Sequence, residues 1–262
     1  MGWKIFISSL ILALIILLPI ARKAEIRRKV AVIGSLIVGS LTGTATIILF
    51  SYKGISYPFI VKLLIEVGFI ILFTGIIGIY RFYRDPTRIP LRTQNVILTP
   101  ADGSVRYIKP IEPKTLSQIP FNDFGDALGI ERGWIIGITM TYLDVHVNRS
   151  PVDGSIPLVK HIPGKFLSLK KDEALYKNKR VIMVIDQGRF KIGLILTASR
   201  VVRKILVWIN EGDEVKAGQR IGKIVLGSQT DIIVPLLPNL QINVREGEQI
   251  YAGLTILAQY KY

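Results

Sequence analysis

Long apolar runs occupy the first third of the chain, and short apolar runs separated by turn residues occupy the rest. The runs 5–21 and 30–50 contain no charged residue, and each is close to the ~20 residues that a membrane-spanning helix needs. A third run, 59–80, contains Lys62 and Glu66, so it predicts a span only if that pair lies at the membrane interface or is shielded from lipid. We therefore expect a membrane anchor over residues 1–80, with helices at about 5–21, 30–50 and 59–80.

Basic residues flank these runs unevenly, which predicts an orientation because cytoplasmic loops carry an excess of Lys and Arg. Lys53 lies alone between the second and third runs, whereas two larger groups follow the first and third runs: Arg22, Lys23, Arg27, Arg28 and Lys29, and then Arg81, Arg84, Arg88 and Arg92. Three spans place both groups in the cytoplasm with the N-terminus outside, and two spans would separate them. The pattern favours a three-span anchor in the cell membrane with the rest of the chain on the cytoplasmic side, although the sequence leaves open whether 59–80 crosses the membrane or lies in its interface.

The first run could also be a secretory signal peptide, but no small-x-small cleavage site is evident and further apolar runs follow, so we expect an uncleaved anchor. In the second run, Gly39 and Gly43 form a GxxxG pattern that permits close helix approach. We expect this face to pack against the first or third helix rather than to form a dimer.

After residue 81 the sequence changes to short Val- and Ile-rich runs bounded by Gly, Pro, Asp and Asn, the pattern of a mainly β domain. A short helix is expected near 172–175 and an extended loop over 110–129. The expected strands are Val96–Leu98, Val105–Lys109, Ile135–Asn148, Val181–Asp186, Lys191–Thr197, Val201–Asn210, Arg220–Val225, Thr230–Val234 and Ile256–Gln259.

Two internal similarities point to duplication within the region 81–262. Residues 209–221 (INEGDEVKAGQRI) match 244–256 (VREGEQIYAGLTI) at five positions, and 100–105 (PADGSV) matches 151–156 (PVDGSI). The glycine-containing hairpin resembles the turns of lipoyl-type and hybrid-barrel β domains, in which glycine supplies the positive φ of tight turns. We therefore expect a duplicated β motif.

The net charge of +15 bears on which partners the protein binds. Residues 1–80 carry +6 and residues 81–262 carry +9, so the β region is moderately basic and follows a membrane anchor. No helix-turn-helix, zinc-finger or RNA-binding consensus accompanies the charge. We expect acidic lipid headgroups, and no nucleic acid, to be its partners.

The chain has no cysteine and only two histidines, His146 and His161. This composition excludes disulfide scaffolds, iron–sulfur clusters, thiol nucleophiles and multi-histidine metal sites. Chemistry must therefore come from hydroxyls, carboxylates, amines, an imidazole or a cofactor.

Three stretches could carry chemistry: 99–103, 142–151 and 226–229. Within the second, a strand would place Asp144, His146 and Asn148 on one face and the valines between them on the other. A histidine satisfied by its own structural contacts is the alternative interpretation. The other two stretches, a Pro-x-Asp-Gly turn and a Gly-Ser dipeptide, carry little information alone.

Taken together and in this order, the motifs FYRDPTRIP (82–90), TPADGSV (99–105), DVHVNRSPVDG (144–154) and Gly227-Ser228 resemble the phosphatidylserine decarboxylase family. The resemblance covers roughly 81–262 and is strongest to the short bacterial and archaeal branch, so archaetidylserine is a second candidate substrate. It implies an enzyme that converts a serine phospholipid into the corresponding ethanolamine phospholipid.

The resemblance also implies a proenzyme that cuts itself between Gly227 and Ser228, leaving a β chain of residues 1–227 and an α chain of residues 228–262 that stay together as a heterodimer; a homodimer is left open. Ser228 would become a pyruvoyl group, which forms a Schiff base with the substrate amine and accepts the electrons released with CO2. No metal and no pyridoxal phosphate is expected.

By the same resemblance, Asp102 and His146 would orient and deprotonate Ser228, and His146 would later transfer protons. Longer family members have a second histidine three positions on, where this chain has Arg149. Either His146 covers both roles or cleavage uses a different base. Arg149 and Asp144 are candidates for binding the substrate headgroup.

Two other functions compete with the decarboxylase. A membrane-tethered hybrid-barrel adaptor would use the repeated hairpin for binding, and a surface protein that binds acidic lipid would use its charge without catalysis. An extracytoplasmic C-terminus would favour the first, and salt-sensitive binding with no product would favour the second.

Overall fold

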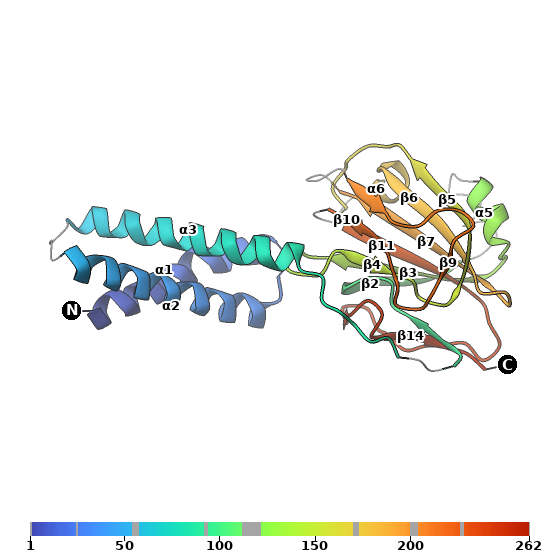
Figure 1. Ribbon diagram of the computed structural model, residues 1–262, viewed down its shortest axis with the longest axis horizontal. Helices are drawn as coiled ribbons and strands as arrows, with labels where there is room; N and C mark the ends of the chain where they lie inside the picture. The colour runs from blue at the N-terminus through green and yellow to red at the C-terminus, as the bar shows by residue number, and fades with distance from the viewer. Residues whose placement is uncertain are drawn as a thin grey trace. The chain divides into compact units, whose positions relative to one another are not determined.

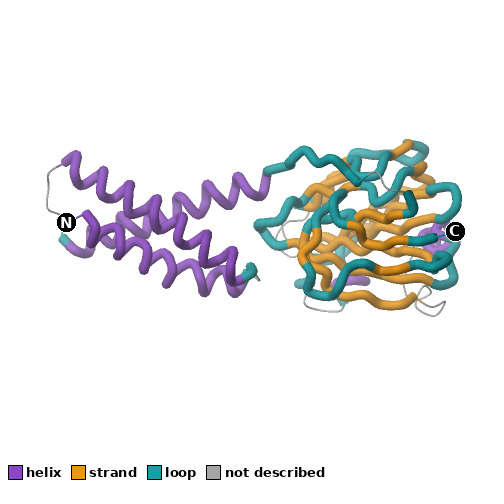
Figure 2. The backbone as a smooth tube through the Cα atoms, turned by 90° about the horizontal axis from the view of Figure 1, so that it is seen from below, coloured by secondary structure: helices purple, strands orange, loops and turns teal. Residues whose placement is uncertain are grey.

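The computed structural model describes residues 2–24, 26–53, 58–91, 94–111, 122–169, 173–199, 204–225 and 228–261. The chain divides into two compact units (Figures 1 and 2). One unit comprises Met1–Tyr83 with Thr141–Leu143 and is helical, and the other comprises Arg84–Met140 with Asp144–Tyr262 and is mostly β.

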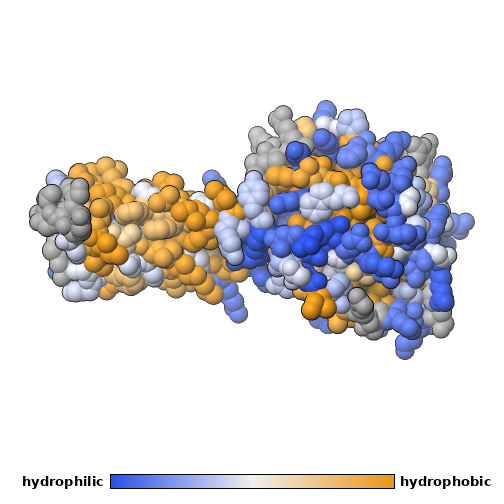
Figure 3. Space-filling view, viewed as in Figure 1, coloured by the Kyte–Doolittle hydropathy of each residue, from blue (hydrophilic) through white to orange (hydrophobic). Residues whose placement is uncertain are grey.

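The helical unit contains three helices, α1 (Gly2–Lys23), α2 (Arg28–Lys53) and α3 (Phe59–Tyr83). Each is long and apolar enough to cross a membrane, which confirms the three expected helices and extends them by a few residues. Figure 3 shows apolar side chains over the visible face of this unit. Trp3, Ile15 and Ile71 are among its exposed apolar residues. An apolar outer surface is what a helix bundle presents to lipid.

Close contact between α1 and α2 explains the two glycines of the second helix. A Cβ atom at Gly39 would lie 2.9 Å from the Cα atom of Leu10, and one at Gly43 would lie 3.0 Å from the ring of Phe6. Both glycines therefore let the α1 backbone approach, as the expected packing against the first helix requires. Ala13, Val38 and Ile70 form the small core among the three helices.

Glu66 of α3 is buried within the helical unit, with 6% of its surface exposed. Its carboxylate accepts hydrogen bonds from the hydroxyls of Ser9, at 3.0 Å, and Ser8, at 3.3 Å, both on α1. Lys62, one turn earlier, lies over the ring of Phe50. The serines shield the carboxylate from the surroundings of the bundle, as we expected for Glu66 if the third helix spans the membrane.

The β unit consists of fourteen described strands and two short helices, α5 (Asn122–Leu128) and α6 (Ala174–Lys177). The first seven strands are β1 (Val96–Leu98), β2 (Gly103–Ile111), β3 (Gly133–Met140), β4 (Val147–Arg149), β5 (Gly154–Ile162), β6 (Arg180–Asp186) and β7 (Lys191–Ala198). The others are β8 (Ile205–Val207), β9 (Glu214–Val215), β10 (Arg220–Ile224), β11 (Ser228–Pro235), β12 (Gln241–Ile242), β13 (Gln249–Ile250) and β14 (Ile256–Gln259).

These strands form three antiparallel sheets. The largest has the order β13-β2-β3-β11-β7-β6-β5-β9, and the two small ones have the orders β1-β14-β12 and β4-β10-β8. The main apolar core lies on one face of the large sheet, and a second cluster with Phe124 and Leu128 of α5 covers part of the other face. Strand β11, which begins at Ser228, lies at the centre of the large sheet between β3 and β7.

The strand orders reveal that the whole β unit is an internal duplication. Exchanging β1 with β4, β2 with β5, β3 with β6, and β11–β14 with β7–β10 maps the large sheet onto itself and one small sheet onto the other. The backbone bonds between the halves are reciprocal: Leu98 donates to the Pro151 carbonyl at 2.9 Å and Arg149 to the Pro100 carbonyl at 2.8 Å. The expected duplicated motif is thus confirmed and extends beyond the two short repeats.

Matched turns repeat the same geometry in the two halves. Gly212 and Gly247 have φ of 90° and 79°, and Gly218 and Gly253 have φ of 79° and 71°. Only glycine adopts such positive φ values without strain, which is why these positions stand out in the repeat.

Three expectations about secondary structure were wrong. The expected strand 135–148 ends at Met140, and Asp144 and His146 lie in a turn before β4, so the alternating polar face does not exist. Part of the expected loop forms α5, because Phe124 and Leu128 supply an apolar face that packs on the sheet. Strand β5 was missed, since Lys160 and His161 conceal its alternation.

Candidate functional site

His146 lies in the turn that leads into β4 and is completely buried. Its Nδ1 atom is 2.9 Å from the backbone carbonyl oxygen of Asp144. A carbonyl can only accept, so Nδ1 carries the hydrogen and the neutral ring has its lone pair on Nε2. Burial lowers the pKa of His146 to about 4, although the bond to Asp144 acts in the opposite direction. The imidazole is therefore neutral at pH 7 and able to accept a proton.

Backbone and side-chain bonds bring the segment around His146 to both sides of the peptide bond between residues 227 and 228. The His146 carbonyl accepts from the Ile224 amide at 3.1 Å, and Asn148 donates to the Thr230 hydroxyl at 2.8 Å. Ile224 lies four residues before Ser228, and Thr230 lies two residues after it. The segment that contains His146 thus contacts the chain shortly before and shortly after Ser228.

Ser228 is the first residue of β11, and its backbone pairs with Met140 of β3 and Ala198 of β7. Gly227, the expected residue on the other side of the cut, lies outside the described residues. The strand that begins at residue 228 is held on both edges. This pairing anchors the residue independently of the peptide bond that precedes it.

Asp102 is buried, with only 2% of its side chain exposed, and forms an ion pair with Arg88. Both guanidinium NH2 groups of Arg88 donate to its two carboxylate oxygens, and Ala252 donates its amide hydrogen at 2.8 Å. In the other half of the duplication, Asp153 accepts the Ala217 amide in the same way at 2.7 Å. Asp102 therefore makes the same backbone contact as its counterpart Asp153, and in addition it pairs with the buried Arg88.

Arg149 is buried and bound to the segment that precedes β1. It donates to Asp85 and the Pro86 carbonyl, each at 3.1 Å, and to the Gly218 carbonyl at 2.9 Å. Burial lowers its pKa, and the charge of Asp85 partly offsets that effect. Asp144 accepts a hydrogen bond from Gln249 at 3.0 Å. Both candidate headgroup ligands thus already bind protein groups.

A buried polar network follows Ser228 directly and was not identified from the sequence. Gln229 accepts from Arg106 at 2.9 Å and donates to Asp231 at 2.7 Å and to the Tyr107 hydroxyl at 3.0 Å. The Tyr107 hydroxyl in turn donates to Asp231. Burial raises the pKa of Asp231 to about 6, and burial together with the charge of Asp231 raises the pKa of Tyr107. The signal in the sequence was a lone Asp inside an apolar strand.

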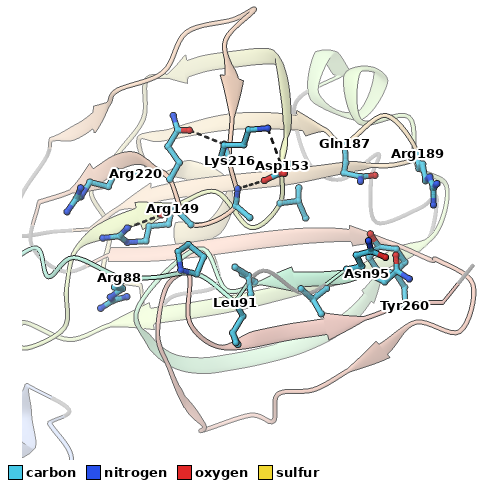
Figure 4. Close-up of a pocket in the computed structure, with 18 residues that line it drawn as sticks. Arg88, Leu91, Asn95, Arg149, Asp153, Gln187, Arg189, Lys216, Arg220 and Tyr260 are labelled. Carbon is cyan, nitrogen blue, oxygen red and sulfur yellow. Dashed lines mark hydrogen bonds and ion pairs between the residues drawn. The ribbon is translucent and has the colours of Figure 1, made fainter.

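A cleft of about 1090 Å³ lies on the β unit and shares Arg88 and Arg149 with the site (Figure 4). Its lining also includes Asn95 and Asp153, which correspond in the duplication to His146 and Asp102. Several of its cations are paired: Arg88 with Asp102, Arg149 and Arg220 with Asp85, and Lys216 with Asp153. The cleft therefore reaches the counterpart of the candidate site in the other half.

Comparisons with known proteins show the family to which the chain is similar. The sequence profile of the family described as "Phosphatidylserine decarboxylase" matches residues 77–258. The chain is 40% identical over 181 residues to the "Putative archaetidylserine decarboxylase proenzyme" of Methanocaldococcus jannaschii, which covers 68% of this chain and 87% of that protein. A protein of the same name from Methanothermobacter thermautotrophicus is 35% identical over 195 residues, covering 73% of this chain and 84% of that protein.

Proposed function

The chain belongs to the phosphatidylserine decarboxylase family and is a decarboxylase, and from this premise we propose that it matures by cutting itself between Gly227 and Ser228. We propose that the mature enzyme removes CO2 from the serine headgroup of phosphatidylserine or archaetidylserine. The names of the archaeal relatives support the second substrate and the proenzyme form.

The observation that carries the proposal is the position of the buried, neutral His146. Its segment is bonded to Ile224 and, through Asn148, to Thr230, one on each side of the bond to be cut. A base with its lone pair on Nε2 and a pKa lowered to about 4 stays unprotonated at pH 7. We assign His146 as the group that accepts the Ser228 hydroxyl proton.

The chemistry follows from the residue types. The Ser228 oxygen attacks the Gly227 carbonyl, which has no side chain to hinder it, and the acyl group moves from nitrogen to oxygen to give an ester. β-Elimination then releases residues 1–227 with a free carboxylate and leaves dehydroalanine at 228. Addition of water and loss of ammonia convert that residue into a pyruvoyl group.

The fold suits a group formed in this way. Residues 228–262 contribute β11, β13 and β14, which pair with β3, β7, β2 and β1 of the longer fragment. The new N-terminus therefore stays in the centre of the sheet after the cut. When formed, the pyruvoyl ketone supplies an electron sink for decarboxylation. His146 would then move a proton at the same place, while Arg88 holds the charge of Asp102, whose field slightly favours protonated His146.

We further propose that Arg149 acts on the substrate indirectly. Its bonds to Asp85 and Pro86 hold the segment before β1 against Gly218, and that segment also carries Arg88. We propose that α1–α3 cross the membrane and that the β unit lies on the cytoplasmic side, next to acidic lipid.

Intact mass spectrometry of the purified chain tests the maturation. The expected result is two fragments, residues 1–227 and a 35-residue α chain whose N-terminal group is lighter than an unmodified serine terminus by the mass of one ammonia molecule. Ser228→Ala should remain one chain and release no CO2 from serine lipids in mixed micelles. A wild-type chain that stays whole with an ordinary serine at 228 after long incubation contradicts the proposal. Parallel assays with diacyl and archaeol-type lipids distinguish the two substrates.

A further inference from the structure

The polar network beside Ser228 depends on a row of three residues across neighbouring strands. Tyr107 of β2, Gly137 of β3 and Asp231 of β11 are direct partners in the sheet register. A Cβ atom at Gly137 would lie 2.5 Å from the ring of Tyr107. The absent side chain thus lets the ring cross β3 and bring its hydroxyl to Asp231, two strands away.

The other half of the duplication shows what the sheet needs at these positions. The equivalent row is Leu158 of β5, Val184 of β6 and Gly193 of β7, again just after the bulge in the register of the outer strand. Leu158 and Val184 belong to the apolar cluster under α5. The same strand arrangement is therefore stable with an apolar row, and the fold does not require the buried Tyr107–Asp231 pair.

Burying a carboxylate is costly, so the pair calls for an explanation other than stability. The half of the duplication that contains the pair also contains the bond between residues 227 and 228, at which we propose the cleavage. Gln229, the next residue, is fully buried; its side chain accepts a hydrogen bond from Arg106 and donates to Tyr107 and Asp231. The hydroxyl oxygens of its strand neighbours, Thr139 and Thr197, make no hydrogen bond within the described part of the chain. They offer no substitute for those bonds.

We propose that Tyr107 and Asp231 are positioning residues for self-cleavage: by fixing the side chain of Gln229, they hold residue 228 where its hydroxyl reaches the carbonyl of residue 227. This inference rests on the proposed function. Intramolecular attack is sensitive to placement, and an error of about 1 Å can cost about 100-fold in rate. Residue 228 is the first residue of its strand, so its placement depends on its pairing with β3 and β7 and on the residue that follows.

Tyr107→Phe is the sharpest test, because it removes only the hydroxyl that bonds Asp231 and Gln229. The full chain is made in detergent, and the first-order rate of its maturation is followed by intact mass spectrometry. We expect the rate to fall about 10-fold or more, while the decarboxylation kcat of the matured fraction stays near that of the wild type. Asp231→Asn keeps an acceptor oxygen and should mature faster than Asp231→Leu.

Val184→Ala is the matched control, since it weakens the equivalent row of the other half without touching Gln229. It should lower the unfolding temperature and leave the maturation rate unchanged. Equal slowing by Val184→Ala, or wild-type maturation of Tyr107→Phe and Asp231→Leu, overturns the positioning role. Reduced kcat with a normal maturation rate overturns it as well. A wild-type chain that never cleaves refutes the proposed function itself, which separates the two failures.

Discussion

The imidazole of His146 is neutral at physiological pH because burial lowers its pKa to about 4. Asp231, on the strand that begins at Ser228, is shifted the other way, since burial raises its pKa to about 6. In both groups, removal from water disfavours the charged form. The unusual ionisation at this site is therefore a consequence of where the fold places two ordinary side chains.

His146 should make the protein sensitive to acid. An unfolded histidine has a pKa near 6.5 and the folded one about 4, so between these values the unfolded chain binds a proton that the native chain lacks. Its contribution to stability is complete above pH 6.5 and is lost as the pH falls through 4, amounting to roughly 3 kcal/mol. Asp231 acts oppositely, favouring the native state at low pH and losing that effect as the pH rises through 6.

The measurement compares unfolding temperatures of the wild type and His146→Gln at pH 7 and pH 4. On acidification the unfolding temperature of the wild type should fall further than that of the variant. Asp231 is present in both proteins, so its effect on this difference cancels. An equal loss in the two proteins would show that His146 is not buried as a neutral group.

Replacing Arg88, a buried residue of the β unit, should strongly lower the stability of the fold. Arg88→Ala leaves the carboxylate of Asp102 buried without its cation, and breaking such a pair typically costs about 3–5 kcal/mol. Lys216→Ala removes the exposed counterpart next to Asp153 and should change stability by no more than about 0.5 kcal/mol. Thermal unfolding of both variants in detergent checks the contrast, and similar values for the two would contradict the assignment of Asp102 as a buried, paired carboxylate.

At the scale of elements, duplication gives the two halves the same strands but different chemistry. His146 comes from the turn before β4 in one half, whereas Asp102 and Ser228 belong to the other. Asn95 occupies the place equivalent to His146 before β1. The proposed site therefore takes residues from both halves, and the equivalent positions of the other copy lack the imidazole.

In the anchor, the small-residue face of α2 should control how closely the helices pack. Gly39→Leu would place its side chain into the backbone of α1, and overpacking of this kind costs about 1–3 kcal/mol. Gly34→Leu is the control, because a Cβ atom at that position meets nothing within 4 Å. Gly39→Leu should lower the unfolding temperature of the detergent-solubilised chain, and Gly34→Leu should not. Equal effects would mean that α1 and α2 do not pack through Gly39.

At the scale of the whole molecule, the absence of cysteine allows the membrane orientation to be read with single labels. Lys216 is exposed on the β unit and Ser51 is exposed near the end of α2. In intact cells, Ser51→Cys should react with an impermeant maleimide, and Lys216→Cys should react only after lysis. Labelling of Lys216→Cys from outside would place the β unit on the opposite face.

Much of the fold was accessible from residue patterns, and the order of the motifs selected the candidate site. The apolar runs predicted three helices, the glycine-rich repeat predicted duplicated turns, and the motif order selected Asp102, His146 and Ser228. Patterns failed where partners come from distant segments. Glu66 argued against a third spanning helix, because its shielding by Ser8 and Ser9 of another helix is not visible in the sequence. The turn containing Asp144 and His146 was mistaken for a strand.

The sequence by itself determined the three long apolar helices, the mainly β character of the rest and the family, because these depend on local periodicity and on motifs in a fixed order. Tertiary structure alone decided the environment of each group. Burial makes His146 neutral, Arg88 from the segment before β1 pairs with Asp102, and the Tyr107–Gln229–Asp231 network joins β2 to β11. Burial and hydrogen-bond partners set the energy of a charge, and neither is encoded in its neighbours along the sequence.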